Sequence, residues 1–462
     1  MASLDQLPPE ILMTILDELR MSELAAVIRV NRQFFNLGIR RLWQAQRDIY
    51  LAKVPKDRRR VYTPLIQELD LDGAPKALYE EFKDLEFDNV KELSVTLKED
   101  LDTIDDCGYL THFINPGLQL LDLEGDITPD FLLDVQNQCP KLRTVNLWRC
   151  GSCVAPEDFL AFLRGLAYLE SLRINMDHVC MADSKVIEFL ATSSTLEQLT
   201  LEKIYPVFLT DALTVEAPFA QLKRLDIEIT QDAFASIAKL FSSVLQLRVT
   251  FRATDSWDRR ETEVVRIRPL SEMTELRTLE ISFHDETILV PEDLVTLRSL
   301  RNLASLSLHG LSEVHLGAAE FSDDHFHRLV SGLQDLVTLS LHPYPGKVTS
   351  ASLAALAKCC PHLETCFIGG EFNVLGLQDY DAPLFPRLAP FRVRCFLDPD
   401  KYDGDPVEVI ERRAGEHAQQ LERHFPKADI QVLQGWFSNP GSFTSTVMRL
   451  LRPRNERDFG PS

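Results

Sequence analysis

The chain has 462 residues, a length that fits two or three ordinary domains or one extended array of repeats. Its 70 Asp and Glu residues against 49 Lys and Arg residues give a formal net charge of −21, which argues against a nucleic-acid coat or a basic membrane binder. We find no secretory leader and no run of about 18 apolar residues, so we expect neither secretion nor a membrane span. Nine scattered cysteines suit a reducing compartment, and we expect a cytoplasmic or nuclear protein.

Residues 1–47 predict three short helices in one small domain. Pro8 suits a first helical turn, and apolar residues then recur at three- and four-residue spacing as far as Leu19. Ser22 and Asn31 are suitable caps for the second and third helices. The first helix is apolar at positions 11, 12, 13, 15 and 16, a wider arc than one core-facing stripe requires. A further partner should cover part of this arc, either the rest of the chain or another protein.

The same segment resembles an F-box motif over its whole length, from Leu7-Pro8-Pro9-Glu10-Ile11-Leu12 to the closing Leu42-Trp43. Asn31 departs from the Cys or Ser that the family often has at this position. The resemblance implies docking on the Skp adaptor of a cullin-RING (SCF) ubiquitin ligase. A few aliphatic side chains, worth ~1.5–3 kcal/mol each when fully buried, can hold such a partner. By this analogy the adaptor-binding residues are Leu7, Pro8, Ile11, Leu12, Ile15, Leu24, Val27 and Trp43.

Residues 48–87 are expected to be a connector. Its basic run, Lys56-Asp57-Arg58-Arg59-Arg60, is expected to be a solvated face rather than a nuclear signal or a phosphate-binding patch. From residue 88 a repeat recurs: an apolar residue, two others, a second apolar residue, one other, and a third. Its sets run from Val90-Leu93-Val95 and Leu118-Leu121-Leu123 to Leu363-Cys366-Ile368, with a late one at Leu388-Phe391-Val393. The mean period of about 27 residues is that of long leucine-rich repeats.

We therefore predict an α/β fold, in which the three-helix F-box precedes a leucine-rich-repeat solenoid over residues 88–433. The solenoid should be a horseshoe with parallel strands on its concave side and helices on its convex side. Residues 434–462 are expected to be a tail that is disordered by default or folds back onto the concave face.

Strand alternation places the intervening residues of each strand on the concave surface, and such surfaces bind proteins. Two steps of 32 and 33 residues, 244 to 276 and 303 to 336, contain insertions that are either recognition loops or tolerated surface loops. The candidate target-binding residues are Trp148, Arg173, Asp226, Glu228, Arg248, Trp257, His309 and His342. Acids predicted on the same side indicate a protein target with a basic surface, namely Asp122, Glu124, Glu202, Asp226, Glu228 and Glu280.

Motifs of catalysis and metal binding are weak. Cys150 and Cys153 form a lone pair without a second pair of ligands, and His325 and His327 are two apart, so a helix turns them to different faces. We expect no cofactor, no metal and no catalytic centre, and hence a non-catalytic subunit that supplies proximity. Two alternatives stay open: a scaffold whose adaptor complex joins no cullin, and a sensor of a small acid or phosphate. A sensor would need a cluster of Arg and Lys residues on the concave surface, whereas the arginines expected there are interspersed with acidic residues.

Overall fold

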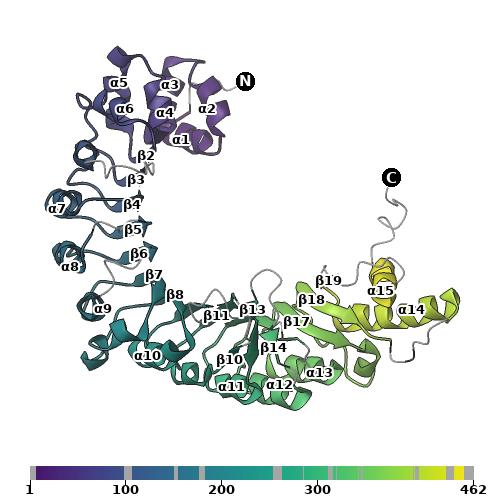
Figure 1. Cartoon of the computed structure of the whole chain (residues 1–462). Helices are drawn as coiled ribbons and strands as arrows, with labels where there is room; N and C mark the ends of the chain where they lie inside the picture. Colours follow the sequence, from purple (N-terminus) through teal and green to yellow (C-terminus); the bar gives the residue numbers. More distant parts are fainter. Residues whose placement is uncertain are drawn as a thin grey trace. The chain divides into compact units, whose positions relative to one another are not determined.

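The computed structural model describes residues 7–97, 107–149, 154–175, 183–252, 263–284, 286–310, 316–318, 320–341, 343–344, 347–398, 400, 405–432 and 442–451. It divides into two compact units, Met1–Glu202 and Lys203–Ser462. Parallel strands with helices in their connections build both units (Figure 1).

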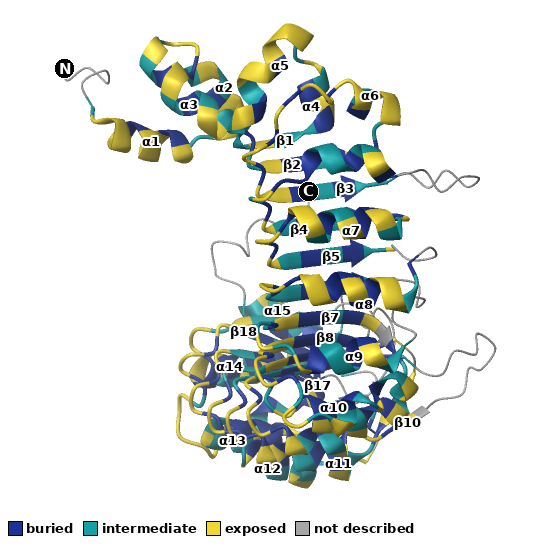
Figure 2. Cartoon of the chain, turned by 90° about the vertical axis from the view of Figure 1, so that its left-hand side faces the viewer, coloured by how far each residue is buried: buried dark blue, intermediate teal, exposed yellow. Residues whose placement is uncertain are grey.

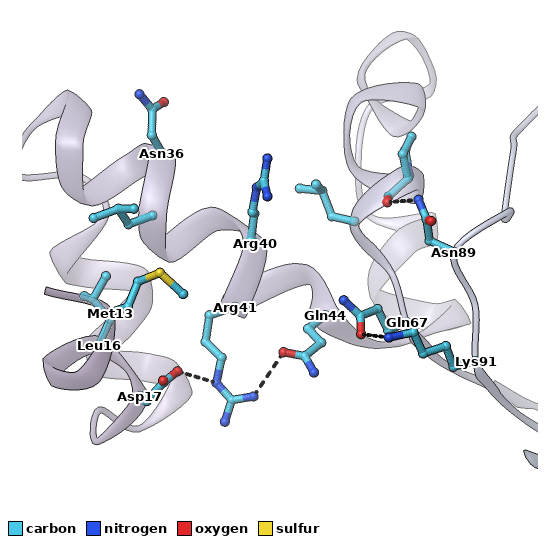
Figure 3. Close-up of a pocket in the computed structure, with 13 residues that line it drawn as sticks. Met13, Leu16, Asp17, Asn36, Arg40, Arg41, Gln44, Gln67, Asn89 and Lys91 are labelled. Atoms are coloured by element: carbon cyan, nitrogen blue, oxygen red, sulfur yellow. Dashed lines mark hydrogen bonds and ion pairs between the residues drawn. The ribbon is translucent and has the colours of Figure 1, made fainter. Parts of the chain in front are cut away.

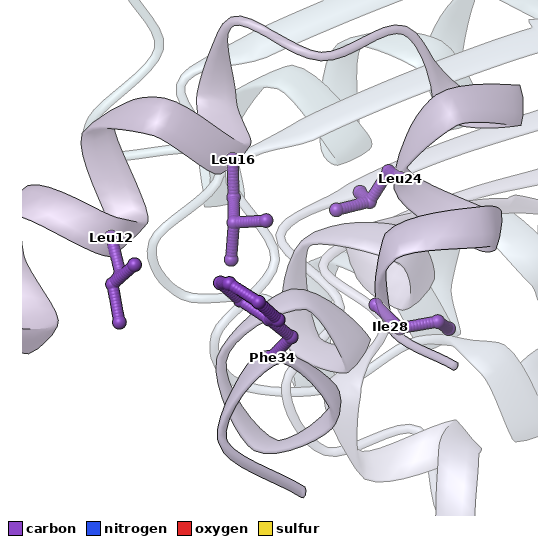
Figure 4. Close-up of a cluster of buried hydrophobic side chains, with 5 residues drawn as sticks. All are labelled: Leu12, Leu16, Leu24, Ile28 and Phe34. Atoms are coloured by element: carbon purple, nitrogen blue, oxygen red, sulfur yellow. The ribbon is translucent and has the colours of Figure 1, made fainter. Parts of the chain in front are cut away.

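Three helices at the N-terminus pack into one small domain: α1 (Pro9–Asp17), α2 (Met21–Val27) and α3 (Arg32–Gln44). Pro9 lies in the first turn of α1, where a missing N–H leaves no helical bond unmade, and Asn31 caps α3 by accepting the Phe34 amide at 2.8 Å. The core is formed by buried side chains of all three helices (Figure 4): Leu12, Leu16, Leu24, Ile28 and Phe34. The expected helical domain is confirmed.

The segment expected to be a connector, residues 48–87, is the start of the solenoid. It contains α4 (Asp48–Ala52), α5 (Lys56–Tyr62), a 3-10 turn (Thr63–Leu65), β2 (Glu68–Asp72) and α6 (Lys76–Glu80). The short strand β1 (Ala45–Arg47) follows α3 directly and pairs with β2, which in turn pairs with β3 (Glu92–Thr96). The parallel sheet therefore begins at Ala45. Ile66, Leu69 and Leu71 are buried at the same spacing as the apolar residues of the later repeats, so this segment is a repeat as well.

The basic run in α5 contains one cation that is structural. Arg59 is 5% exposed, and its guanidinium donates to the carbonyls of Val54 at 3.0 Å and Ala52 at 2.8 Å. The same group pairs with Glu81 at 3.3 Å and lies over the ring of Phe82. The expectation of a solvated face is therefore wrong for Arg59, which joins the end of α4 to the end of α6.

Unit 1 continues with one strand per repeat, all in parallel register, with α-helices in three of the connections. Its strands are β4 (Leu120–Glu124), β5 (Thr144–Trp148), β6 (Ser171–Asn175) and β7 (Gln198–Ile204), and its helices are a 3-10 segment (Cys107–Phe113), α7 (Pro129–Gln138), α8 (Pro156–Gly165) and α9 (Ser184–Ala191). Helices α7 and α8 cover one face of these strands (Figures 1 and 2). The register aligns buried aliphatic side chains into ladders, such as Leu121, Val145, Leu172 and Leu199.

Unit 2 repeats the same plan. Its main strands are β8 (Arg224–Ile229), β9 (Gln246–Phe251), β11 (Thr278–Phe283), β13 (Ser305–Gly310), β15 (Thr338–Leu341), β17 (Thr365–Phe372), β18 (Pro390–Phe396) and β19 (Asp429–Val432), all parallel. Its helices are α10 (Phe234–Leu240), α11 (Pro291–Thr296), α12 (Asp323–Val330) and α13 (Ser350–Cys359), with short 3-10 turns between them. The expected α/β solenoid of parallel strands and helices is confirmed.

A second, smaller sheet lies in unit 2 and was not expected. Four short parallel strands form it in the order β10 (Glu263–Val265), β12 (Thr287–Leu289), β14 (Leu316–Gly317) and β16 (Pro343–Tyr344). Two of these strands belong to the two long steps of the repeat. The described parts of both insertions thus add backbone pairing alongside the main sheet.

The C-terminal part of unit 2 ends in two packed helices, α14 (Val407–His424) and α15 (Phe443–Leu451). The hydroxyl of Thr444 in α15 accepts the amide of Phe396 at 3.1 Å and donates to its carbonyl at 3.1 Å, so α15 is fastened to the end of β18. The expectation of a disordered tail over 434–462 is wrong for α15, because this amphipathic segment buries its apolar face. The residues on both sides of it lie outside the described ones.

Candidate functional site

Helix α1 presents different apolar residues to its own core and to solvent. Leu12 is 0% exposed and belongs to the core, whereas Ile11 is 49% exposed and Ile15 is 42% exposed. Ile11 and Ile15 are one turn apart, so they lie on the same flank of the helix. Yellow, exposed segments alternate with buried ones along α1 (Figure 2). This flank of α1 therefore leaves apolar surface exposed to solvent.

The other predicted adaptor-binding residues divide between the surface and the core. Pro8 is exposed at the start of α1, and Leu7 and Val27 are half-buried against the core. Leu24 is 1% exposed inside the core, so its side chain, like that of Leu12, packs within the domain. Trp43 stacks on the ring of Tyr62 at 4.4 Å between centroids, which joins the helical domain to the first repeat.

Further apolar residues of the helical domain are exposed that the resemblance did not single out: Met13, Met21, Val30 and Phe35. Met13, at 51% exposure, lies on the opposite flank of α1 from Ile11, because two residues turn a helix by about 200°. The wide apolar arc in the sequence indicated that both flanks of α1 carry apolar residues. It did not indicate which of its residues are buried in the core of the domain.

The strand face of unit 1 has a hollow of about 500 Å³. It is lined by Asp122, Glu124, Trp148, Arg149, Asn175 and Glu202. The guanidinium of Arg173 lies over the Trp148 ring at 5.1 Å, so these two predicted residues contact each other. Asn146 donates to Asp122 at 2.9 Å, and Arg149 pairs with Glu124. The hollow thus has more carboxylates than cations in its lining, and its aromatic ring is already in contact with Arg173.

Arg149 holds its side chain at this hollow through an uncommon backbone conformation. Its φ is +50°, in the left-handed region that residues other than glycine rarely adopt. Its amide donates to the Asn175 carbonyl at 2.6 Å, which fixes the end of β5 to β6. Strained residues of this kind persist where the surrounding structure determines them.

The strand face of unit 2 has carboxylates that are already paired. Arg248 donates from Nε to Glu280 at 3.0 Å and lies 3.5 Å from Asp226. The hydrogen bond with Glu280, together with the charges of Glu280 and Asp226, raises the pKa of Arg248. Arg252 pairs with Glu228 at 3.0 Å. The predicted Arg248 is thus shared by two predicted acids, Glu280 and Asp226, while the predicted Glu228 pairs with Arg252.

The remaining candidates on the strand face are histidines and one tryptophan. His309 lies between two hydroxyls, with Nε2 3.0 Å from Ser282 and Nδ1 3.2 Å from Ser307. Trp257 and His342 lie outside the described residues.

Of the two histidines considered for metal binding, His325 has structural partners and His327 is exposed. Nδ1 of His325 lies 2.8 Å from the Ser322 hydroxyl at the start of α12, and its Nε2 lies 3.3 Å from Glu292. Within the described ranges, no three His, Cys, Asp or Glu residues gather as metal ligands would. Cys150 and Cys153 are outside those ranges, whereas Cys139 and Cys360 are buried thiols. In the same part of the chain, none of the helices has the length and apolarity that a bilayer span requires.

Comparison with known proteins agrees with the helical domain. The F-box-like family matches residues 4–47, a range that includes α1, α2, α3 and the short strand β1. No curated protein matches the chain. The crystal structure of the Rad7 and Elc1 complex in yeast is similar over 86% of this chain and 91% of that one, at 13% identity and a TM-score of 0.41.

The class of protein is thus defined by its parts: an F-box-like domain at the N-terminus, followed by an α/β solenoid of parallel strands. The F-box-like domain supports an adaptor role for the chain.

Proposed function

We propose that the chain is a substrate-recognition subunit of an SCF ubiquitin ligase. The F-box-like domain docks on a Skp-type adaptor, and the strand faces of the solenoid hold a target protein for ubiquitination. The chain itself is non-catalytic, needs no cofactor and acts in the cytoplasm or the nucleus. The observation that carries the proposal is the exposed flank of α1, where Ile11 and Ile15 leave apolar surface uncovered on a domain that matches the F-box-like family.

Burial within the domain favours the exposed flank over the full set of residues that the resemblance implies. Leu12 and Leu24 already bury their side chains in the domain's own core, so they have little surface left to give to a partner. Ile11 and Ile15 each have nearly half of their surface left, and covering it contributes roughly 1 kcal/mol per side chain. Pro8 adds exposed apolar surface at the start of the same helix.

Coexpression of the full chain with a Skp-type adaptor tests the docking step. The native chain should copurify with the adaptor, and the double variant Ile11→Asp/Ile15→Asp should not. Leu133→Asp is the matched control, because Leu133 is an equally exposed apolar residue on α7 of the solenoid. Absence of the adaptor from the native preparation, or its retention by the double variant, would contradict the proposal.

Target capture is the second step, and the hollow at Trp148 is the part of the strand face that fits a basic side chain. Proximity labelling under proteasome inhibition should enrich a target with the native chain and lose it with Trp148→Ala. Tyr168→Ala is the control, because Tyr168 is an exposed aromatic outside the hollow. Equal loss in both variants would remove the hollow from the proposal.

A scaffold that acts outside a cullin complex is the second candidate function. It shares the adaptor-docking surface, so the discriminating measurement is the presence of cullin in the complex recovered with the native chain. A target that is enriched but not degraded in an adaptor-dependent manner would favour the scaffold.

A further inference from the structure

A groove of about 800 Å³ separates the F-box-like domain from the first turns of the solenoid, within unit 1 (Figure 3). One side is formed by α1 and α3, and the other by the turns that precede β2 and β3. Aliphatic side chains give it an apolar lining, contributed by Met13, Leu16, Leu37 and Leu65. Met13 is on the opposite flank of α1 from Ile11 and Ile15, so the groove is separate from the proposed adaptor surface.

The charge of the groove is opposite to that of the chain. Its lining includes three cations, Arg40, Arg41 and Lys91, and a single carboxylate, Asp17. Arg41 lies 3.5 Å from Asp17, in a pair whose partners are both about half exposed, so the pair is weak. The groove therefore has a local excess of cations in a chain whose net charge is −21.

The cations differ in how far they are engaged. Lys91 donates to the amide oxygen of Gln67 at 3.2 Å, and this neutral contact leaves its charge uncompensated. The guanidinium of Arg40 makes no hydrogen bond or ion pair with any residue that the structure describes. Arg40 and Arg41 extend from adjacent positions of α3, while Lys91 approaches from the solenoid side (Figure 3). An anion between them would be contacted from both sides.

We propose that this groove binds an acidic linear segment of a partner protein that also carries an aliphatic side chain. The carboxylates pair with Arg40 and Lys91, and the aliphatic side chain covers the exposed part of Met13 and its apolar neighbours. A protein segment fits better than a nucleic acid, because the overall negative charge of the chain repels a long polyanion, whereas a short acidic segment meets only the local cations. The proposal does not depend on adaptor docking.

Fluorescence anisotropy with the full chain tests the proposal. The probe is a labelled peptide of about twelve residues made of Asp, Glu and Leu, and the matched probe replaces every acid by Asn or Gln. The native chain should bind the acidic probe about tenfold more tightly than the amide probe. Binding should weaken as salt rises from about 50 to about 300 mM.

Two pairs of substitutions locate the site. Arg40→Gln/Lys91→Gln should weaken the acidic probe about tenfold, whereas Arg29→Gln/Arg32→Gln should not, because these exposed cations of the same domain do not line the groove. Met13→Gln should weaken binding of the probe that contains Leu more than that of one with Ser in place of Leu. Equal affinity for both probes, equal effects of the two double variants, or a single-stranded oligonucleotide that binds with the same variant dependence would overturn the proposal.

Discussion

Replacing Leu12 by alanine is expected to destabilise the F-box-like domain far more than replacing its neighbour Ile11. Leu12 is fully buried, and a buried Leu→Ala substitution costs about 2–5 kcal/mol. Ile11 is 49% exposed, so its truncation removes roughly 1 kcal/mol or less of burial. A helical domain of this size has a total stability of roughly 2–6 kcal/mol, so the loss at Leu12 is comparable with the whole.

Hydrogen exchange of the α1 to α3 amides in the full chain measures this difference, since a repeat protein opens locally. Leu12→Ala should accelerate exchange about 30-fold or more, and Ile11→Ala about fivefold or less. Amides of the buried strand β9 in unit 2 are the internal control and should not change. If both variants accelerated exchange equally, the division of α1 into a core side and a partner side would be refuted. When the two variants are compared at equal folded fraction, Ile11→Ala should weaken adaptor binding more than Leu12→Ala does.

Three further predictions concern groups buried in the solenoid. Tyr79→Phe removes the hydroxyl that donates to the fully buried Asp48 at 2.8 Å, and should lower the free energy of unfolding by about 1–3 kcal/mol. Burial raises the pKa of Cys360 to about 12, so iodoacetamide should alkylate the partly exposed Cys359 first in the folded chain. Burial lowers the pKa of His424, so the unfolded chain takes up this proton first as the pH falls. Stability should therefore decrease below about pH 6.5, and His424→Gln should flatten that dependence.

Each of these predictions has its own control. Urea unfolding of Tyr62→Phe, a half-buried tyrosine, should show a smaller loss than Tyr79→Phe. In denaturant, both cysteines should react at the same rate, and a persistent difference would mean that burial is not the cause. His327→Gln, at an exposed position, should leave the pH dependence as it is in the native chain. An unchanged slope in His424→Gln would contradict the assignment of that proton.

The repeats could be predicted because each one carries the same physical requirement. A strand that is covered on one face by a helix needs apolar residues at alternate positions, and this spacing is visible in the sequence without any knowledge of the partner strand. Ile66, Leu69 and Leu71 show the same spacing, so β2 could also have been predicted, although residues 48–87 were expected to be a connector. Strand β1 could not, because Ala45–Arg47 is polar and is a strand only through its pairing with β2.

Hydrophobic periodicity could predict neither the second sheet nor which residues of α1 lie on each flank. Strands of two or three residues, such as Leu316–Gly317, have no periodicity to detect and depend on neighbours that the long insertions bring together. On α1, every residue of the apolar arc satisfies the helical spacing equally. Only packing against α2 and α3 decides that Leu12 is central while Ile11 and Met13 lie on either flank.

The charge of the chain shows why composition predicts a partner only weakly. A net charge of −21 indicated a concave surface that attracts a basic target, yet the acids differ in what surrounds them. In unit 2, Glu280 and Asp226 share Arg248, so a basic partner would have to compete with an arginine that is already in place. In unit 1, the hollow beside Trp148 is lined by three carboxylates and one arginine, and Glu124 pairs with that arginine, Arg149. The groove between the F-box-like domain and the first turns of the solenoid has an excess of cations and so favours an acidic segment. The two proposals therefore place a basic segment and an acidic segment at separate sites of one chain. Salt should weaken binding at both sites, whereas a charge-reversing substitution should affect binding at one site only.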